Sequence, residues 1–168
     1  MTNIGQRIRE LPGERRGVAA LEFALALPVL IILLAGGYEL GRALWQHHLV
    51  AKGVRDAARY LTRVPDPSAA QYVDRATNLV IRGSFDAAAA PLLWDWQDDP
   101  SLIQIQVSKE TVDNSAGTFR GPDGGTADID IVRVTATVQY RGTGLLAFIG
   151  MAGGIQYSLA HEERHFGE

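Results

Sequence analysis

The pattern of hydrophobic positions begins with one long apolar run near the start of the chain. Residues 18–37 read VAALEFALALPVLIILLAGG, in which 16 of 20 positions are hydrophobic and Glu22 is the single charged residue. A helix of twenty residues is about 30 Å long, which matches the hydrocarbon thickness of a membrane. The alternative is a buried helix of a soluble core, but such a helix normally keeps a polar face. We therefore expect residues 18–37 to be inserted in a membrane.

The helical pattern continues beyond residue 37, with polar residues mixed in. Two prolines, Pro65 and Pro67, then end it. The sequence thus predicts a helix over residues 18–63 whose outer half is amphipathic and packs on the rest of the protein. Its apolar face is expected to contain Leu40, Leu44, Ala51, Val54, Ala58 and Leu61.

A second, shorter helix is predicted after the prolines. Ser68 and Gln71 have the spacing of a capping box, and Gly83 supplies a C-terminal stop. Residues 94–99 contain two tryptophans and three aspartates, and we expect a loop there. This loop is either a solvated turn whose aromatic rings cover an edge of the core, or a binding loop for a ligand or partner. The apolar face of the short helix is predicted to contain Tyr72, Ala76, Leu79 and Val80.

Alternation of apolar and polar residues predicts three strands, over residues 103–108, 132–141 and 155–160. One apolar and one polar face per strand indicates an antiparallel sheet packed on a helix. Between the first two strands, residues 113–125 are rich in Gly, Asp and Ser and predict a flexible surface loop. Residues 145–149 are expected to form a buried or membrane-proximal connection. The predicted fold class is α+β: a long N-terminal hydrophobic helix, a short helix and a small antiparallel sheet.

Composition and charge exclude several classes of protein. The chain has no cysteine, so no disulfide framework is possible. Its formal net charge of −3 argues against nucleic-acid binding, because no excess of positive charge is present to displace counterions from phosphate.

The basic residues on the two sides of the apolar run differ slightly in number. Four arginines precede the run, two of them directly before it at Arg15 and Arg16, and three basic residues lie in the twenty positions that follow it. This small bias predicts a cytoplasmic N-terminus and export of the residues beyond Tyr38.

The charge at Glu22 needs an explanation, because an acid in hydrocarbon costs about 3 kcal/mol without a partner. The surrounding sequence, RRGVAALEF, resembles the processing site of type IV pilin-like proteins: basic residues, Gly, four mostly apolar residues, then Glu and an aromatic residue. Over residues 14–63 the chain is similar, more narrowly, to TadE-like minor pilins or pseudopilins of the tight-adherence (Flp-type, type IVb) pilus system. The features in common are Gly17-x-x-x-x-Glu22-Phe23, Leu27-Pro28, Glu39 with Gly41-Arg42, and Ala57-Ala58-Arg59-Tyr60.

The resemblance implies that a prepilin peptidase cleaves the chain between Gly17 and Val18. Glu22, followed by Phe23, would then be the fifth residue of the mature protein. Its carboxylate can neutralise the amine of a neighbouring subunit, which makes two buried charges tolerable and sets the register between subunits. The alternative for Glu22 is an acid that reaches the aqueous edge of the membrane.

The implied domains are a leader peptide over residues 1–17, a transmembrane and amphipathic stalk helix over 18–63, and an exported α+β head over 64–168. The head is expected to be periplasmic and the protein to be single-pass in the inner membrane, or to enter the pilus. Within the stalk, Arg59 and Tyr60 are expected to brace the helix against the head or to contact a partner.

The implied function is non-enzymatic: a minor pilin or pseudopilin that takes part in assembly of a tight-adherence pilus, by priming the filament or by incorporation. The expected partners are the prepilin peptidase, the pilus assembly platform, the major pilin and other minor pilins, and the inner membrane, without nucleic acid. No cofactor and no metal is expected.

Two other functions stay open. One is a signal-anchored envelope protein whose exported domain binds a ligand. The other is a membrane-tethered zinc hydrolase, since residues 161–165 fit the H-E-x-x-H pattern, in which two histidines one helical turn apart bind zinc and Glu162 activates water. That chemistry requires a helix and a third ligand, yet the motif follows a strand pattern and only three residues remain after His165. Calcium at Asp123, Asp128 and Asp130 is a weaker alternative, because the order of residues does not match an EF-hand loop.

Overall fold

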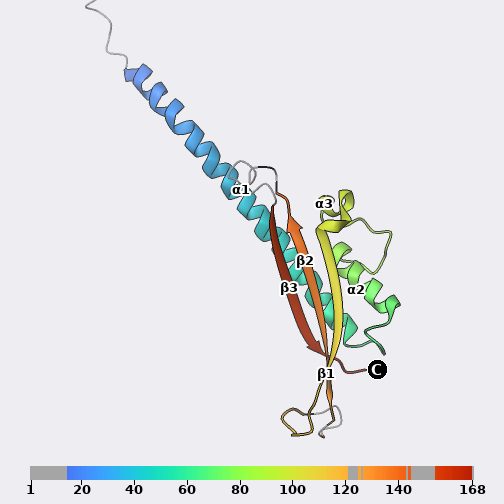
Figure 1. Ribbon diagram of the computed structural model, residues 1–168. Coiled ribbons are helices and arrows are strands. Elements are labelled where there is room, and N and C mark those ends of the chain that lie inside the picture. The colour runs from blue at the N-terminus through green and yellow to red at the C-terminus, as the bar shows by residue number, and fades with distance from the viewer. Residues whose placement is uncertain (1–14, 121–124, 126, 143, 145–153, 168) are drawn as a thin grey trace, which may run out of the picture. The chain divides into compact units, whose positions relative to one another are not determined.

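The structure is a computed structural model that describes residues 15–120, 125, 127–142, 144 and 154–167 (Figure 1). Residues 1–14 of the expected leader and the apolar connection at 145–149 lie outside the described residues. The elements follow the predicted order, and the fold is α+β as expected. They are α1 (Arg15–Leu61), α2 (Ala70–Arg82), α3 (Trp94–Asp98), the 3-10 helix η2 (Pro100–Leu102), β1 (Ile103–Val112), β2 (Ile129–Tyr140) and β3 (Ile155–Arg164).

The chain divides into two compact units, residues 1–40 and residues 41–168. The described part of the first unit is the apolar half of α1, with Pro28 inside the helix. Its large apolar side chains from Val18 to Leu34 are 40–74% exposed. Among the described residues, α1 is the one helix long and apolar enough to cross a membrane. A single-pass membrane anchor is therefore compatible with the structure.

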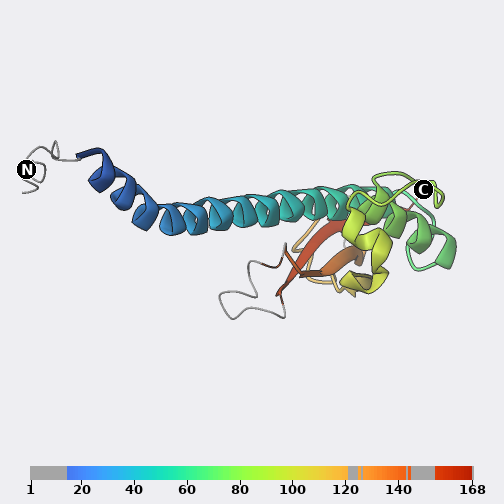
Figure 2. The same cartoon turned by 90° about the horizontal axis from the view of Figure 1, so that it is seen from above.

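The second unit is a three-stranded antiparallel sheet in the order β1-β2-β3, with helices on one face. Ala136 in the central strand pairs with Ile105 on one side and Leu159 on the other. Figures 1 and 2 show that the part of α1 within this unit lies along one face of the sheet. Alternation along β2 directs every second side chain toward the helices, as the sequence predicts. The core therefore combines helix and strand residues: Val50, Val54, Ala57, Ala58 and Leu61 with Val132, Val134, Ala136 and Val138.

The apolar face expected along α1 is correct only in its second half. Leu40 and Leu44 are exposed, and the packed face includes Val50 instead. The prediction failed there because helical periodicity identifies a stripe of apolar residues, while the position of the sheet decides how far along the helix that stripe is covered.

Helix α2 buries Ala76 and Val80 as predicted, and it ends at Gly83 in the left-handed conformation with φ of 67°. The predicted capping box at its start is wrong. The helix begins at Ala70, after an N-cap at Ala69 that makes no side-chain hydrogen bond. Ser68 instead donates its backbone N–H to the Asp66 carboxylate at 2.9 Å, in a local turn that competes with capping.

The loop expected over residues 94–99 is also wrong, because residues Trp94–Asp98 form the short helix α3. Asp99 then accepts a hydrogen bond from the backbone N–H of Ser101 at 3.1 Å and caps the following 3-10 helix. This hydrogen bond and the one from the Ser101 hydroxyl, which acts most strongly, lower the pKa of Asp99. Side-chain capping by Asp99 thus organises η2, the 3-10 turn that directly follows α3.

Candidate functional site

The residues expected at the processing site, Gly17, Val18, Glu22 and Phe23, all lie in the first turns of α1. All four residues are exposed. Val18 and Glu22 are four residues apart in a helix and therefore occupy neighbouring positions on one face. Within the described part of the chain, Glu22 forms no hydrogen bond or ion pair. The structure thus presents one unpartnered carboxylate among exposed apolar side chains, which is an arrangement suited to binding a cation on another molecule.

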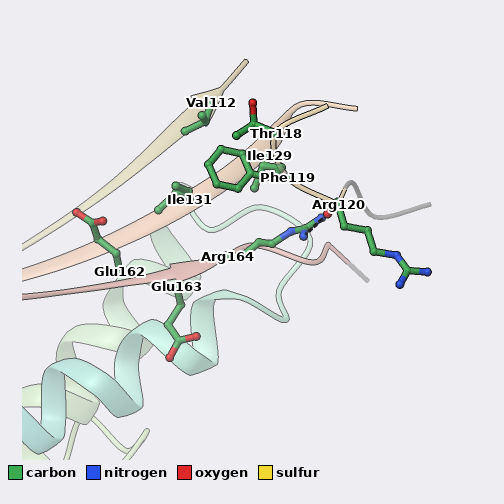
Figure 3. Close-up of a pocket in the computed structure, with 9 residues that line it drawn as sticks. All are labelled: Val112, Thr118, Phe119, Arg120, Ile129, Ile131, Glu162, Glu163 and Arg164. Atoms are coloured by element: carbon green, nitrogen blue, oxygen red, sulfur yellow. Dashed lines mark hydrogen bonds between the residues drawn. The ribbon is translucent and has the colours of Figure 1, made fainter. Parts of the chain in front are cut away.

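The head has a hollow of about 600 Å³ on the face of the sheet opposite the helices (Figure 3). Its apolar lining comes from Val112, Ile129 and Ile131, with Phe119 from the loop between β1 and β2. Charged groups stand around this lining: Arg120, Glu162, Glu163 and Arg164.

A buried asparagine organises the loop beside this hollow. The side-chain nitrogen of Asn114 donates to the backbone oxygens of Phe119 at 2.8 Å and Ala127 at 3.2 Å, and its side-chain oxygen accepts from the N–H of Phe119 at 2.8 Å. The sequence predicted only a flexible surface loop, so this residue was missed. An asparagine in this segment does not by itself indicate a buried hydrogen-bonding role, because asparagine is common in loops for its local turn geometry.

The H-E-x-x-H pattern does not form the helical metal site that zinc chemistry requires. His161 to Arg164 lie in strand β3, and Figure 3 shows Glu162 and Glu163 pointing to opposite sides of that strand. The Nε2 atom of His161 is 3.0 Å from the Glu163 carboxylate, and that of His165 is 2.7 Å from the carbonyl oxygen of Val64. The zinc hydrolase interpretation is therefore wrong in its geometry, because a strand extends the spacing between the two histidines to about 13 Å.

The calcium alternative has no support in the described residues. Asp130 is ion-paired with Lys109 at 2.8 Å, and Asp123 lies outside the described part of the chain. Across the described residues, no group of three or more His, Cys, Asp or Glu side chains is arranged to hold a metal ion.

Arg59 and Tyr60 contact the head from the last turns of α1. The Arg59 guanidinium is 3.8 Å from the Glu163 carboxylate, in an ion pair that is largely exposed and weak. The Tyr60 ring packs against Phe85 with 4.9 Å between centroids and against Tyr72 with 6.5 Å. These contacts support the bracing role expected for both residues.

A second set of polar contacts joins α1 to α3, and the sequence alone does not predict it. Arg42 donates to the Asp95 carboxylate at 2.8 Å, and both side chains are mostly buried. The guanidinium carbon of Arg42 also lies 5.3 Å from the centroid of the Trp94 ring. Residues 53 positions apart in sequence form this pair, so no local pattern could indicate it.

Comparison with protein families gives a match of residues 17–59 to the model described as TadE-like protein. The matched segment begins at Gly17 and ends at Arg59, so it includes the expected processing residues and most of α1. The resemblance proposed from the sequence is confirmed over this segment. No curated protein and no solved structure matches the chain.

Proposed function

Because residues 17–59 are a TadE-like segment, we propose that this chain is a minor pilin or pseudopilin that takes part in assembling a tight-adherence pilus. The observation that supports this proposal best is the position of the match. It starts at the glycine of the expected cleavage site and includes Val18, Glu22 and Phe23 in the spacing typical of the family.

In this proposal, three segments of the chain have different roles in processing, membrane anchoring and assembly. Residues 1–17 act as a leader that a prepilin peptidase removes, residues 18–63 form the anchoring and assembly helix, and residues 64–168 form the exported head. The unit that contains the sheet begins at Gly41, and residues of α1 from Val50 to Leu61 are in its core. In the proposed division, residues 41–61 therefore belong to the core of the head as well as to the end of the stalk.

The first unit supports insertion in a membrane or in a bundle of helices. Eleven large apolar side chains between Val18 and Leu34 are exposed, and burial of each contributes roughly 1.5–3 kcal/mol. So large an apolar surface requires cover from lipid or from other helices. A pilin uses both in turn, first in the inner membrane and then in the filament.

Cleavage and assembly are linked through Glu22 in this proposal. Before cleavage the nitrogen of Val18 is a neutral peptide nitrogen, whereas cleavage turns it into an amine. The exposed carboxylate of Glu22 on a neighbouring subunit can then neutralise this amine and fix the axial register of the two helices. Glu22 also lies in the first turn and a half of the mature helix, where a negative charge is stabilised by the helix dipole.

The proposal is tested by complementation of a strain that lacks this chain. Surface pili are counted by electron microscopy after expression of the wild type, Glu22→Gln or Glu110→Gln, with the amount of each protein in the membrane measured by immunoblot. We expect the wild type and Glu110→Gln to restore pili and Glu22→Gln to restore few. Glu110 is a matched control because it is an exposed acid on β1. Normal piliation in the strain without the chain contradicts the proposed function.

A further inference from the structure

Two of the three tryptophans of the chain are exposed on the second unit. Trp94 of α3 is 65% exposed and Trp45 of α1 is 54% exposed, whereas Trp96 is buried. An indole ring offers a large apolar surface with one polar N–H, a combination that favours the boundary between lipid and water. Exposed tryptophans are therefore informative about what the surface contacts.

Arg42 places the two exposed rings in one region. It is ion-paired with Asp95 at 2.8 Å, with side chains only 15% and 13% exposed, and it lies against the Trp94 ring. Trp45 follows Arg42 by three residues on α1, so the two side chains are neighbours on the helix surface. We call Trp45 and Trp94 the tryptophan pair.

The tryptophan pair lies at the end of the second unit that contains its first residues, since Trp45 follows Gly41 by four positions in α1. Helix α3, which carries Trp94, is followed by η2 and then by the first residue of β1, so it lies at the end of the sheet where β1 begins (Figure 1). At the opposite end, the N–H of Phe166 after β3 donates to the carbonyl oxygen of Thr62, one residue beyond the C-terminus of α1. In the sequence, Trp45 follows Gly37, the last residue of the apolar run, by only eight positions.

The charges around the tryptophan pair are largely balanced. Asp95 is paired with Arg42, and Asp99 is paired with Arg141 at 2.7 Å. Asp98 is exposed and adds one negative charge to this region. A surface of this kind gains nothing from anionic lipid, so its attraction to a membrane has to come from the indole rings.

We propose that the tryptophan pair seats the exported head on the lipid–water interface of the membrane through which the apolar helix passes. The partner is the headgroup region of a zwitterionic leaflet. This inference rests on one part of the proposed function, namely that residues 18–37 are in a membrane. In this arrangement the head is held close to the bilayer surface before any transfer to a filament.

The test uses the full-length protein in phosphatidylcholine vesicles, with Trp45 and Trp96 replaced by phenylalanine so that Trp94 is the only tryptophan, and with excitation at a wavelength that tyrosine does not absorb. Vesicles whose acyl chains are brominated at carbons 6 and 7 report contact with lipid, and iodide reports contact with water. We expect bromolipid to reduce Trp94 emission at least twofold and iodide to have little effect. A variant with only Trp96 gives the emission of a ring buried in the core, and thermal unfolding verifies that each variant is folded.

The matched control places a tryptophan at the other end of the head. Phe119 is exposed in the loop after β1, and Phe119→Trp in a background without the three natural tryptophans is expected to respond to iodide and not to bromolipid. If Trp94 responds to iodide in the same way, the inference is overturned. It is also overturned if Trp94 is shielded from both quenchers, since that indicates a contact with another subunit.

A sodium carbonate wash of the same vesicles separates this inference from the proposed function. Protein that stays in the pellet is integrally anchored, so an unquenched Trp94 then contradicts the seating of the head alone. Protein that is released into the supernatant contradicts both the membrane anchor and the seating of the head.

Discussion

Gly53 of α1 packs directly on the backbone of Val80 in α2. A β-carbon on Gly53 would lie 2.9 Å from the α-carbon of Val80 and 3.1 Å from its carbonyl oxygen. Both residues are buried in the core of the head, and the atoms in contact belong to a helix backbone that cannot rotate away. The approach of α2 to α1 therefore depends on the absence of a side chain at this position.

We predict that Gly53→Ala lowers the free energy of unfolding by about 1–3 kcal/mol, because the extra methyl group forces the two helices apart. Alanine has the higher helix propensity, by about 1 kcal/mol, so the sign of the effect distinguishes packing from propensity. Gly41→Ala in the same helix is the control, since nothing lies within 4 Å of that position. It should be neutral or stabilising in detergent-solubilised full-length protein. Equal unfolding curves for the two variants would contradict the described contact.

Much of this fold follows from periodicity in the sequence. Alternation identified all three strands, because one face of each strand is covered by helices and the other is open. The end of α2 at Gly83 was also predictable, since the left-handed conformation that ends a helix strongly favours glycine. The start of α2 was not, because Ser68 and Asp66 both have polar groups able to form local hydrogen bonds, and the sequence does not indicate which one prevails.

How well a site can be predicted from the sequence depends on whether its residues are contiguous. The residues expected at the processing site, from Gly17 to Phe23, form a contiguous motif, so their prediction needs only a resemblance over a few residues. Contacts such as Arg42 with Asp95, or Asn114 with Ala127, join segments that are distant in the sequence or lie across a loop. They depend on how the strands and helices pack, which a single sequence does not specify.

The pH dependence of stability is predicted to involve Asp130. Hydrogen bonds from Lys109, which act most strongly, and from Thr111 lower the pKa of the Asp130 carboxyl. Its folded-state pKa therefore lies below the unfolded value of about 3.9. The stabilisation is present above that unfolded value and is lost as the pH falls through the folded one.

We expect Asp130→Asn to melt at a lower temperature than the wild type at pH 7, and the difference between the two to shrink as the pH falls below the unfolded value of about 3.9. The measurement is the thermal unfolding midpoint at several pH values. Asp74→Asn, an exposed acid on α2, is the control and should follow the wild-type curve. A constant difference between Asp130→Asn and the wild type at every pH would exclude this linkage.

The strand geometry of residues 161–165 predicts that the protein holds no stoichiometric zinc. His165 should matter for stability instead, since its ring is 2.7 Å from the carbonyl oxygen of Val64, and loss of that hydrogen bond costs about 1 kcal/mol. We expect elemental analysis of protein purified without chelator to find well under 0.1 zinc per chain, both in the wild type and in His161→Ala. One zinc per chain in the wild type, absent from His161→Ala, would restore the hydrolase interpretation.

The central claim is that a prepilin peptidase cuts the chain between Gly17 and Val18. It predicts that Gly17→Leu blocks processing, because a large side chain replaces the glycine at the proposed cleavage site, and that Gly37→Leu, which lies beyond this site, leaves processing intact. Gly37 is a suitable control because nothing lies within 4 Å of it in the structure.

The most direct test is the N-terminal residue of the protein isolated from membranes of cells that have the peptidase, determined by mass spectrometry of the intact chain and of its first peptide. We predict a mature N-terminus at Val18 for the wild type and Gly37→Leu, and an uncleaved chain for Gly17→Leu. A wild-type chain that still begins at Met1, or one that begins at any residue other than Val18, contradicts the account.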